Sequence, residues 1–137
     1  MFTPQLLCLA VAFCATALLV ACKDEPLAKG AIAVPSGREV TLIDVITNIP
    51  GNSGAAARFR FLAPGLTAGE TETAAGDMQA LCDGYALPRT DGMVPVPTDI
   101  IISLSAVAVP FGQSSPDVVQ FFETYRAENG TCVWEPF

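Results

Sequence analysis

The chain has 137 residues, 51% of them hydrophobic, and a formal net charge of −7 from 7 Lys and Arg against 14 Asp and Glu. A domain this acidic repels phosphate backbones, which argues against a nucleic-acid partner and against a polybasic membrane patch. The sequence contains no histidine, which removes the commonest general base and the commonest zinc ligand. We therefore predict no catalytic residue, no metal site and no cofactor.

The N-terminal segment has the features of an export signal. The first 21 residues carry no charge, and residues 6–21 form an almost unbroken apolar run that ends in small side chains. A run of this length is typical of a signal peptide. Leu19-Val20-Ala21-Cys22 resembles the lipobox of bacterial lipoproteins, in which the cysteine is acylated and becomes the N-terminus. We therefore predict a signal peptide over residues 1–21 and lipidation of Cys22.

Two features of this segment leave other outcomes open. Residues 1–5 lack the Lys or Arg that usually precedes the apolar run, and Ala15-Thr16-Ala17 offers an ordinary small-x-small cleavage site. Simple secretion, a soluble periplasmic protein and an uncleaved anchor therefore remain alternatives to a lipoprotein that faces the periplasm. We expect residues 22–38 to form a lipidated tether and residues 39–137 a single domain.

The cysteines divide according to this prediction. Cys8 and Cys14 fall in the signal peptide and Cys22 carries the lipid, so Cys82 and Cys132 remain in the domain. An even number of cysteines in an oxidising compartment favours a disulfide between them. Two separate buried thiols or one reactive cysteine are the alternatives. The reactive cysteine is the weakest of the three, since no histidine is present to activate it.

The domain begins with two segments of β-strand character. Residues 39–47 are rich in β-branched side chains, and residues 56–62 alternate between apolar and charged. The loop between them, residues 48–55, consists mostly of turn-forming residues. The two segments are therefore predicted to pair as a hairpin.

The second of these segments contains a candidate binding pair. Phe59 and Phe61 are expected on one face of the strand, and Arg58 and Arg60 on the other, because side chains alternate along a strand. Two arginines on one face can contact an anion or an acidic partner. The alternative is a solvated face on which both arginines pair with nearby carboxylates.

A helix and a buried strand are predicted next. Apolar residues recur at helical spacing over residues 73–85, which places Cys82 on the buried face, and Pro88 is expected to end the helix. The proline-rich loop at residues 88–97 is a candidate ligand-binding loop because of its length, and an insertion without a function is the alternative. The apolar run at residues 99–109 predicts a central strand that is buried on both faces, or one that packs under helices on one face and against another surface on the other.

The C-terminal part is predicted to contain a second helix and a last strand. Ser115 is a candidate N-cap and Pro116 suits the first helical turn, so residues 117–126 are predicted to be helical. Asn129-Gly130 provides the stop and residues 131–135 the closing strand. The fold class expected from this order, ββαβαβ, is α+β, with a four-stranded, mostly antiparallel sheet and two helices on one face.

No motif for catalysis stands out. Gly51-Asn52-Ser53-Gly54 is similar to the nucleophile turn of serine proteases, but a glycine-rich hairpin turn explains it better without a histidine. The fourteen acidic residues include no closely spaced run of the kind that binds calcium. A pair of carboxylates from distant segments, as in a hydrolase, has no local signature.

Four segments of the domain resemble a family of small exported bacterial proteins that is classed as a domain of unknown function. The resemblance lies in PSGREVTLIDVITNIPG, ARFRFLAPG, DMQALCDGYALPR and VPFGQSSPDVVQFFETYRAENGTCVWE. It implies no activity. Some members of that family carry an acetolactate synthase label, which this sequence does not support: such enzymes and their regulatory subunits are cytoplasmic, and the catalytic subunits are several times larger.

Three functions follow from these observations. The first is a non-enzymatic envelope lipoprotein, held to the membrane through its lipid, that interacts with another envelope protein. The second is a binder of a small molecule or an anion, through the loop at residues 88–97 or through Arg58 and Arg60. The third, and the least supported, is a hydrolase with a carboxylate site.

Overall fold

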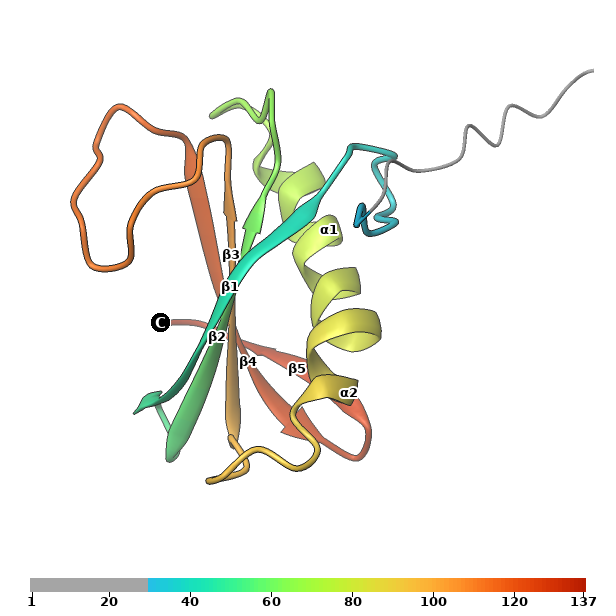
Figure 1. Cartoon of the computed structure of the whole chain (residues 1–137). Coiled ribbons are helices and arrows are strands. Elements are labelled where there is room, and N and C mark those ends of the chain that lie inside the picture. The colour runs from blue at the N-terminus through green and yellow to red at the C-terminus, as the bar shows by residue number, and fades with distance from the viewer. Residues whose placement is uncertain (1–29) are drawn as a thin grey trace, which may run out of the picture.

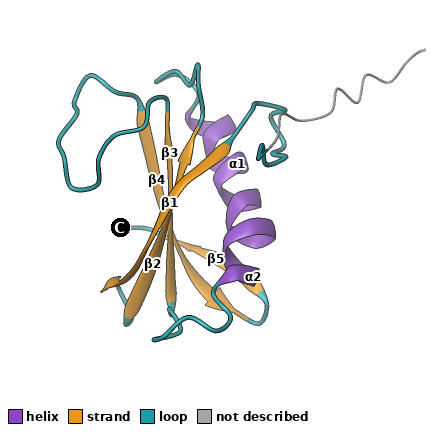
Figure 2. Cartoon of the chain, in the orientation of Figure 1, coloured by secondary structure: helices purple, strands orange, loops and turns teal. Residues whose placement is uncertain are grey.

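The computed structural model describes residues 30–137. The predicted signal peptide over residues 1–21 and the predicted lipidation site Cys22 lie outside the described residues. Five strands form one sheet, and one helical segment packs on one of its faces (Figures 1 and 2). In chain order the elements are β1 Thr41–Pro50, β2 Ala55–Leu62, α1 Thr71–Leu81, a π-helical turn at Cys82–Ala86, α2 Leu87–Arg89, β3 Asp99–Ser105, β4 Gln120–Glu128 and β5 Thr131–Glu135.

The strands lie side by side in the order in which the chain forms them, β1-β2-β3-β4-β5. Neighbouring strands are antiparallel except β2 and β3, which are parallel. A parallel pair needs a crossover connection, and the helical segment provides it. Figure 1 shows this segment on one side of the sheet, whereas the β3–β4 loop, residues 106–119, extends on the opposite side.

The hydrophobic core lies between the helical segment and the sheet. The predicted alternation in β2 is confirmed, since Phe59 and Phe61 are fully buried on the helix side. The ring of Phe61 meets the ring of Tyr85 edge-on, at 5.5 Å between centroids. The other large core side chains come from β3 and the helix, and they are Ile100, Ile102, Leu104, Met78 and Leu81. Strand β3 is central and buried along its whole length, as predicted, although it ends at Ser105 and not at residue 109.

The helix predicted over residues 73–85 is confirmed, but it does not end at Pro88. The chain continues from α1 through the π-helical turn into α2, which contains Pro88. Proline has no N–H to donate, and its ring clashes with the carbonyl four residues earlier in a regular helix. In the wider π-helical turn the N–H of Leu87 donates to the carbonyl of Cys82, five residues back. This local widening allows the helix to include Pro88.

The second predicted helix is wrong. Residues 120–128 form β4, which pairs with β3 on one side and β5 on the other. The apolar spacing that suggested a helix also fits a strand: Phe121 and Tyr125 face the helical segment, while Phe122 faces away from it. Aromatic and β-branched residues favour a strand when paired neighbours are present. The predicted fold class is therefore corrected to a five-stranded mixed sheet with a single helical segment.

The predicted disulfide between Cys82 and Cys132 is present, with 6.1 Å between the two Cα atoms. It joins the π-helical turn that follows α1 to the edge strand β5. The helical segment also hydrogen-bonds to the same strand. The N–H of Cys132 donates to the carboxylate of Asp83 at 2.8 Å, and the side chain of Gln79 donates to the Cys132 carbonyl at 2.9 Å. The disulfide and these hydrogen bonds fix β5 against the helix.

The segment before β1 is attached to the same helix. The fully buried carboxylate of Asp77 accepts hydrogen bonds from the backbone N–H and the hydroxyl of Ser36, at 2.9 and 2.6 Å. Val34 and Val40 are buried on either side of this contact.

Within residues 30–137, no helix is long and apolar enough to cross a membrane.

The β1–β2 turn depends on a second buried carboxylate. Asp99, fully buried at the start of β3, accepts hydrogen bonds from the backbone N–H and the hydroxyl of Ser53, both at 2.8 Å. A Cβ atom at Gly51 would lie 2.4 Å from the Asp99 carboxylate, so a larger residue at this position would force the carboxylate or the turn to move. The glycine-rich segment at residues 51–54 is thus a structural turn in which the serine is bonded to an aspartate.

Asp99→Ala is expected to lower the free energy of unfolding by about 2 kcal/mol, because two hydrogen bonds to a charged acceptor are lost inside the fold. Urea unfolding followed by circular dichroism measures the change. Asp91→Ala is the matched control, since Asp91 lies exposed in the loop that precedes β3. Equal stabilities of the two variants would show that Asp99 does not hold the turn.

Candidate functional site

Arg58 and Arg60 lie on the sheet face opposite the helix, as predicted. We call this surface, which carries Arg58, Arg60, Phe122, Thr124 and Arg126, the open face. The two arginines occupy the middle of β2, beside β3 in the centre of the sheet. The structure therefore places Arg58 and Arg60 side by side on the open face. The two arginines differ in their contacts.

Arg60 is already paired within the fold. Its guanidinium donates to the carboxylate of Asp44 in β1 at 2.8 Å and to the backbone carbonyl of Val109 in the β3–β4 loop. Only 8% of the residue is exposed. Arg60 thus links three parts of the chain, and its charge is balanced by Asp44.

Arg58 has no such partner. The part of the chain that the structure describes contains five arginines. Four of them make an ion pair or a hydrogen bond, namely Arg38, Arg60, Arg89 and Arg126. No carboxylate within residues 30–137 pairs with Arg58, and its buried Nε has no hydrogen-bond acceptor. Its guanidinium instead lies beside two aromatic rings, 5.5 Å from the centroid of Phe111 and 5.6 Å from that of Phe122.

Burial and a neighbouring positive charge make the position of Arg58 electrostatically unfavourable. Partial burial lowers the pKa of the Arg58 guanidinium, and the neighbouring charge of Arg60 lowers it further. The group remains protonated at neutral pH, because the pKa of arginine is so high. Cation–π contacts recover about 0.5–1 kcal/mol at an exposed site, but they do not satisfy the N–H donors in the guanidinium plane. An anion that accepted from these donors would supply the missing partner.

A small cavity adjoins Arg58 and can accommodate such an anion. Its volume is about 150 Å³, and it is formed by β2, the β3–β4 loop and the start of β4. The lining residues are Arg58, Arg60, Val109, Pro110, Phe111, Gly112, Gln113, Gln120 and Phe122. None of them is acidic, although the chain as a whole carries a net charge of −7. The cavity is therefore a positive site on an acidic protein.

The β3–β4 loop forms one wall of this cavity through a tight turn. The N–H of Gln113 donates to the carbonyl of Pro110 at 3.2 Å, and Gly112 between them has a φ of +78°. A positive φ at the third position of such a turn favours glycine. The turn presents Phe111, and the bond from Arg60 to the Val109 carbonyl attaches this part of the loop to the sheet.

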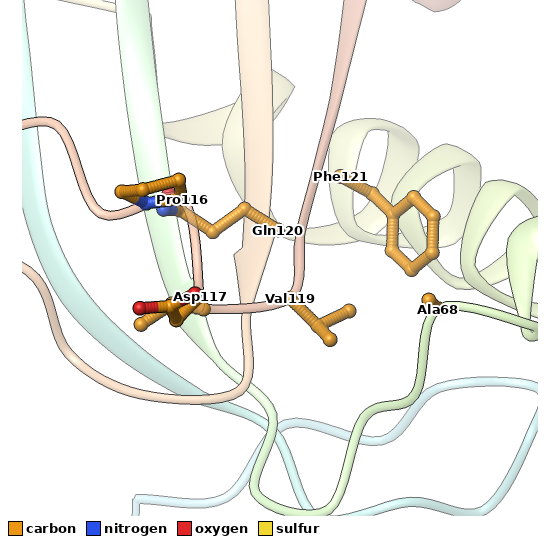
Figure 3. Close-up of a pocket in the computed structure, with 7 residues that line it drawn as sticks. Ala68, Pro116, Asp117, Val119, Gln120 and Phe121 are labelled. Carbon is orange, nitrogen blue, oxygen red and sulfur yellow. The ribbon is translucent and has the colours of Figure 1, made fainter.

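A second cavity, of about 240 Å³, lies at the far end of the same loop. Figure 3 shows Phe121 and Ala68 on one side of it and Pro116 and Asp117 on the other. The one charged residue that lines this cavity is Asp117, so the cavity does not suit an anion. Neither of these two cavities is lined by a pair of carboxylates of the kind that a hydrolase site would use. Within residues 30–137, no three Cys, Asp or Glu side chains are grouped to hold a metal ion.

The other predicted ligand-binding segment is separate from the arginines. The first two residues of the predicted loop at residues 88–97 belong to α2, so the loop itself begins at residue 90. Figure 1 shows this connection from α2 to β3 at the opposite end of the sheet from the β3–β4 loop. Exposed Val94 and Val96 lie in this connection, and neither of them lines the cavity beside Arg58. The site consists instead of Arg58 with Phe111 and Phe122, two residues that the sequence alone did not indicate.

Comparison with known proteins identifies the family. The family described as "Family of unknown function (DUF6497)" matches residues 11–137, so the chain belongs to it. The resemblance to an uncharacterised domain family is thereby confirmed, whereas export, lipidation and the acetolactate synthase label are not part of that match. No curated protein and no solved structure matches the chain.

Proposed function

We propose that this member of the DUF6497 family is a non-enzymatic, envelope-tethered binding module that captures an anionic group at Arg58. The observation that carries the proposal is a guanidinium without a counter-ion, next to a cavity without carboxylates. A cationic donor left unsatisfied inside a fold is costly, so a ligand that accepts a hydrogen bond from it would remove that cost. Arginine is well suited to this role, because its fork of donors matches a carboxylate or a phosphate.

The location outside the cytoplasm is part of the proposal and rests on two features. An uncharged apolar segment ends at Cys22 in a lipobox-like sequence. The domain also contains the Cys82–Cys132 disulfide, and disulfides persist mainly in oxidising compartments. A lipid on Cys22 would hold the domain at the membrane, where the anionic group belongs either to a free ligand or to another envelope component.

The binding proposal is tested by NMR of the arginine side chains in the full chain, titrated separately with acetate and with inorganic phosphate. We expect the Nε–H resonance of Arg58 to shift in a saturable way with at least one of the two anions. Arg126 is the internal control, because it lies on the same face but is already paired with Glu128 and Glu135. If the Arg58 resonance moves no more than that of Arg126 with either anion, the proposed function is wrong.

A further inference from the structure

The charges around the cavity limit the charge of the ligand. The charge of Arg60 is matched by Asp44, so Arg58 provides the single unmatched positive charge. A monoanion bound there leaves no excess charge. A dianion would leave a second negative charge partly desolvated and unpaired, which is unfavourable. The net charge of −7 also repels a ligand more strongly as its negative charge increases.

The aromatic rings at the cavity indicate that the ligand has an apolar part. Phe111 is 49% exposed and Phe122 is 41% exposed, and both rings lie within 6 Å of the Arg58 guanidinium. A flat apolar group placed against these rings removes apolar surface from water on both molecules. The cavity volume of about 150 Å³ is below the usual range for drug-sized ligands, which indicates a small ligand.

We infer that this cavity binds a carboxylate with one negative charge that is attached to a small, flat apolar group. Arg58 holds the carboxylate, and Phe111 and Phe122 contact the apolar group. The amide groups of Gln113 and Gln120, which also line the cavity, can donate further hydrogen bonds to the carboxylate oxygens. The inference rests on the proposed function and adds the chemical class of the ligand.

Isothermal titration calorimetry of the full chain at pH 8 compares four probes. Phenylacetate has both features of the ligand, acetate lacks the ring, 2-phenylethanol lacks the charge, and phenylphosphate carries the ring with a charge of about −2. We expect phenylacetate to bind about tenfold more tightly than acetate and at least about fivefold more tightly than phenylphosphate. We expect no saturable binding of 2-phenylethanol.

Phe111→Ala is expected to weaken the binding of phenylacetate about fivefold and to leave that of acetate unchanged, because only the ring contact is removed. Val107→Ala is the matched control: Val107 is an exposed apolar residue of the same loop, but it does not line the cavity. The same calorimetric titrations measure both variants. An equal loss for the two ligands would show that Phe111 supports the loop and does not contact the ligand.

The outcomes separate the inference from the proposed function. If phenylphosphate binds as tightly as phenylacetate, or if acetate does, the ligand class is wrong while anion binding stands. If none of the three anions binds, both are wrong. A tripeptide that ends in phenylalanine, tested with a free and with an amidated C-terminus, shows whether the carboxylate belongs to a free acid or to the end of a chain. Binding of the free form alone supports the carboxylate class, and equal binding of both forms overturns it.

Discussion

Replacement of both Cys82 and Cys132 by serine is expected to lower the free energy of unfolding by about 4 kcal/mol. The disulfide joins residues 50 positions apart, and a cross-link of that span removes much of the conformational entropy of the unfolded chain. It also holds β5, an edge strand of only five residues. For a domain of this size, the loss corresponds to a decrease in Tm of roughly 15 °C.

Thermal unfolding followed by circular dichroism measures this effect, and the reduced wild-type chain is the control. If the cross-link is the cause, the reduced wild type, both single variants and the double variant should unfold at nearly the same temperature. A double variant with the Tm of the oxidised wild type would contradict the expectation. That result would mean that the hydrogen bonds of Asp83 and Gln79 to Cys132 hold β5 without the disulfide.

Arg58→Met is expected to reduce the affinity for phenylacetate by at least about tenfold, because hydrogen bonds to a charged group contribute roughly 1.5–3 kcal/mol. Methionine retains much of the length and the apolar character of the arginine stem, so the walls of the cavity remain supported. Calorimetric titration of the full chain provides the measurement. Arg126→Met is the matched control, because this substitution also removes an arginine from the open face. The affinity of the Arg126→Met variant for phenylacetate should equal that of the wild type. Equal losses in the two variants would mean that only the net charge matters.

The sheet could be predicted from sequence where local pattern and final environment agree. The alternation in residues 56–62 identified β2 and its two faces, and the apolar run from residue 99 identified the central strand. The pattern of Phe121, Phe122 and Tyr125 is compatible with both a helix and a strand. Pairing with β3 and β5 decides between them, and those partners lie outside the local sequence. Ser115 and Pro116, which suggested a helix start, lie in the β3–β4 loop.

The candidate site was predictable in part. The spacing of Arg58 and Arg60 was enough to place both on one face, because side chains alternate along a strand. Their different roles depend on long-range contacts. The pairing of β1 with β2 brings Asp44 opposite Arg60, and the β3–β4 loop brings Phe111 to Arg58. Neither contact is encoded near β2, so the sequence could not distinguish the paired arginine from the unpaired one.

The central claim is that Arg58 serves a ligand and not the fold, and urea unfolding of ligand-free Arg58→Met tests it most directly. Replacing an unsatisfied charge by an apolar side chain of similar length removes a desolvation cost. We predict that the free energy of unfolding of the variant equals that of the wild type or exceeds it by up to about 1 kcal/mol. A decrease of more than about 1 kcal/mol would contradict the account, because Arg58 would then stabilise the fold through its contacts with Phe111 and Phe122.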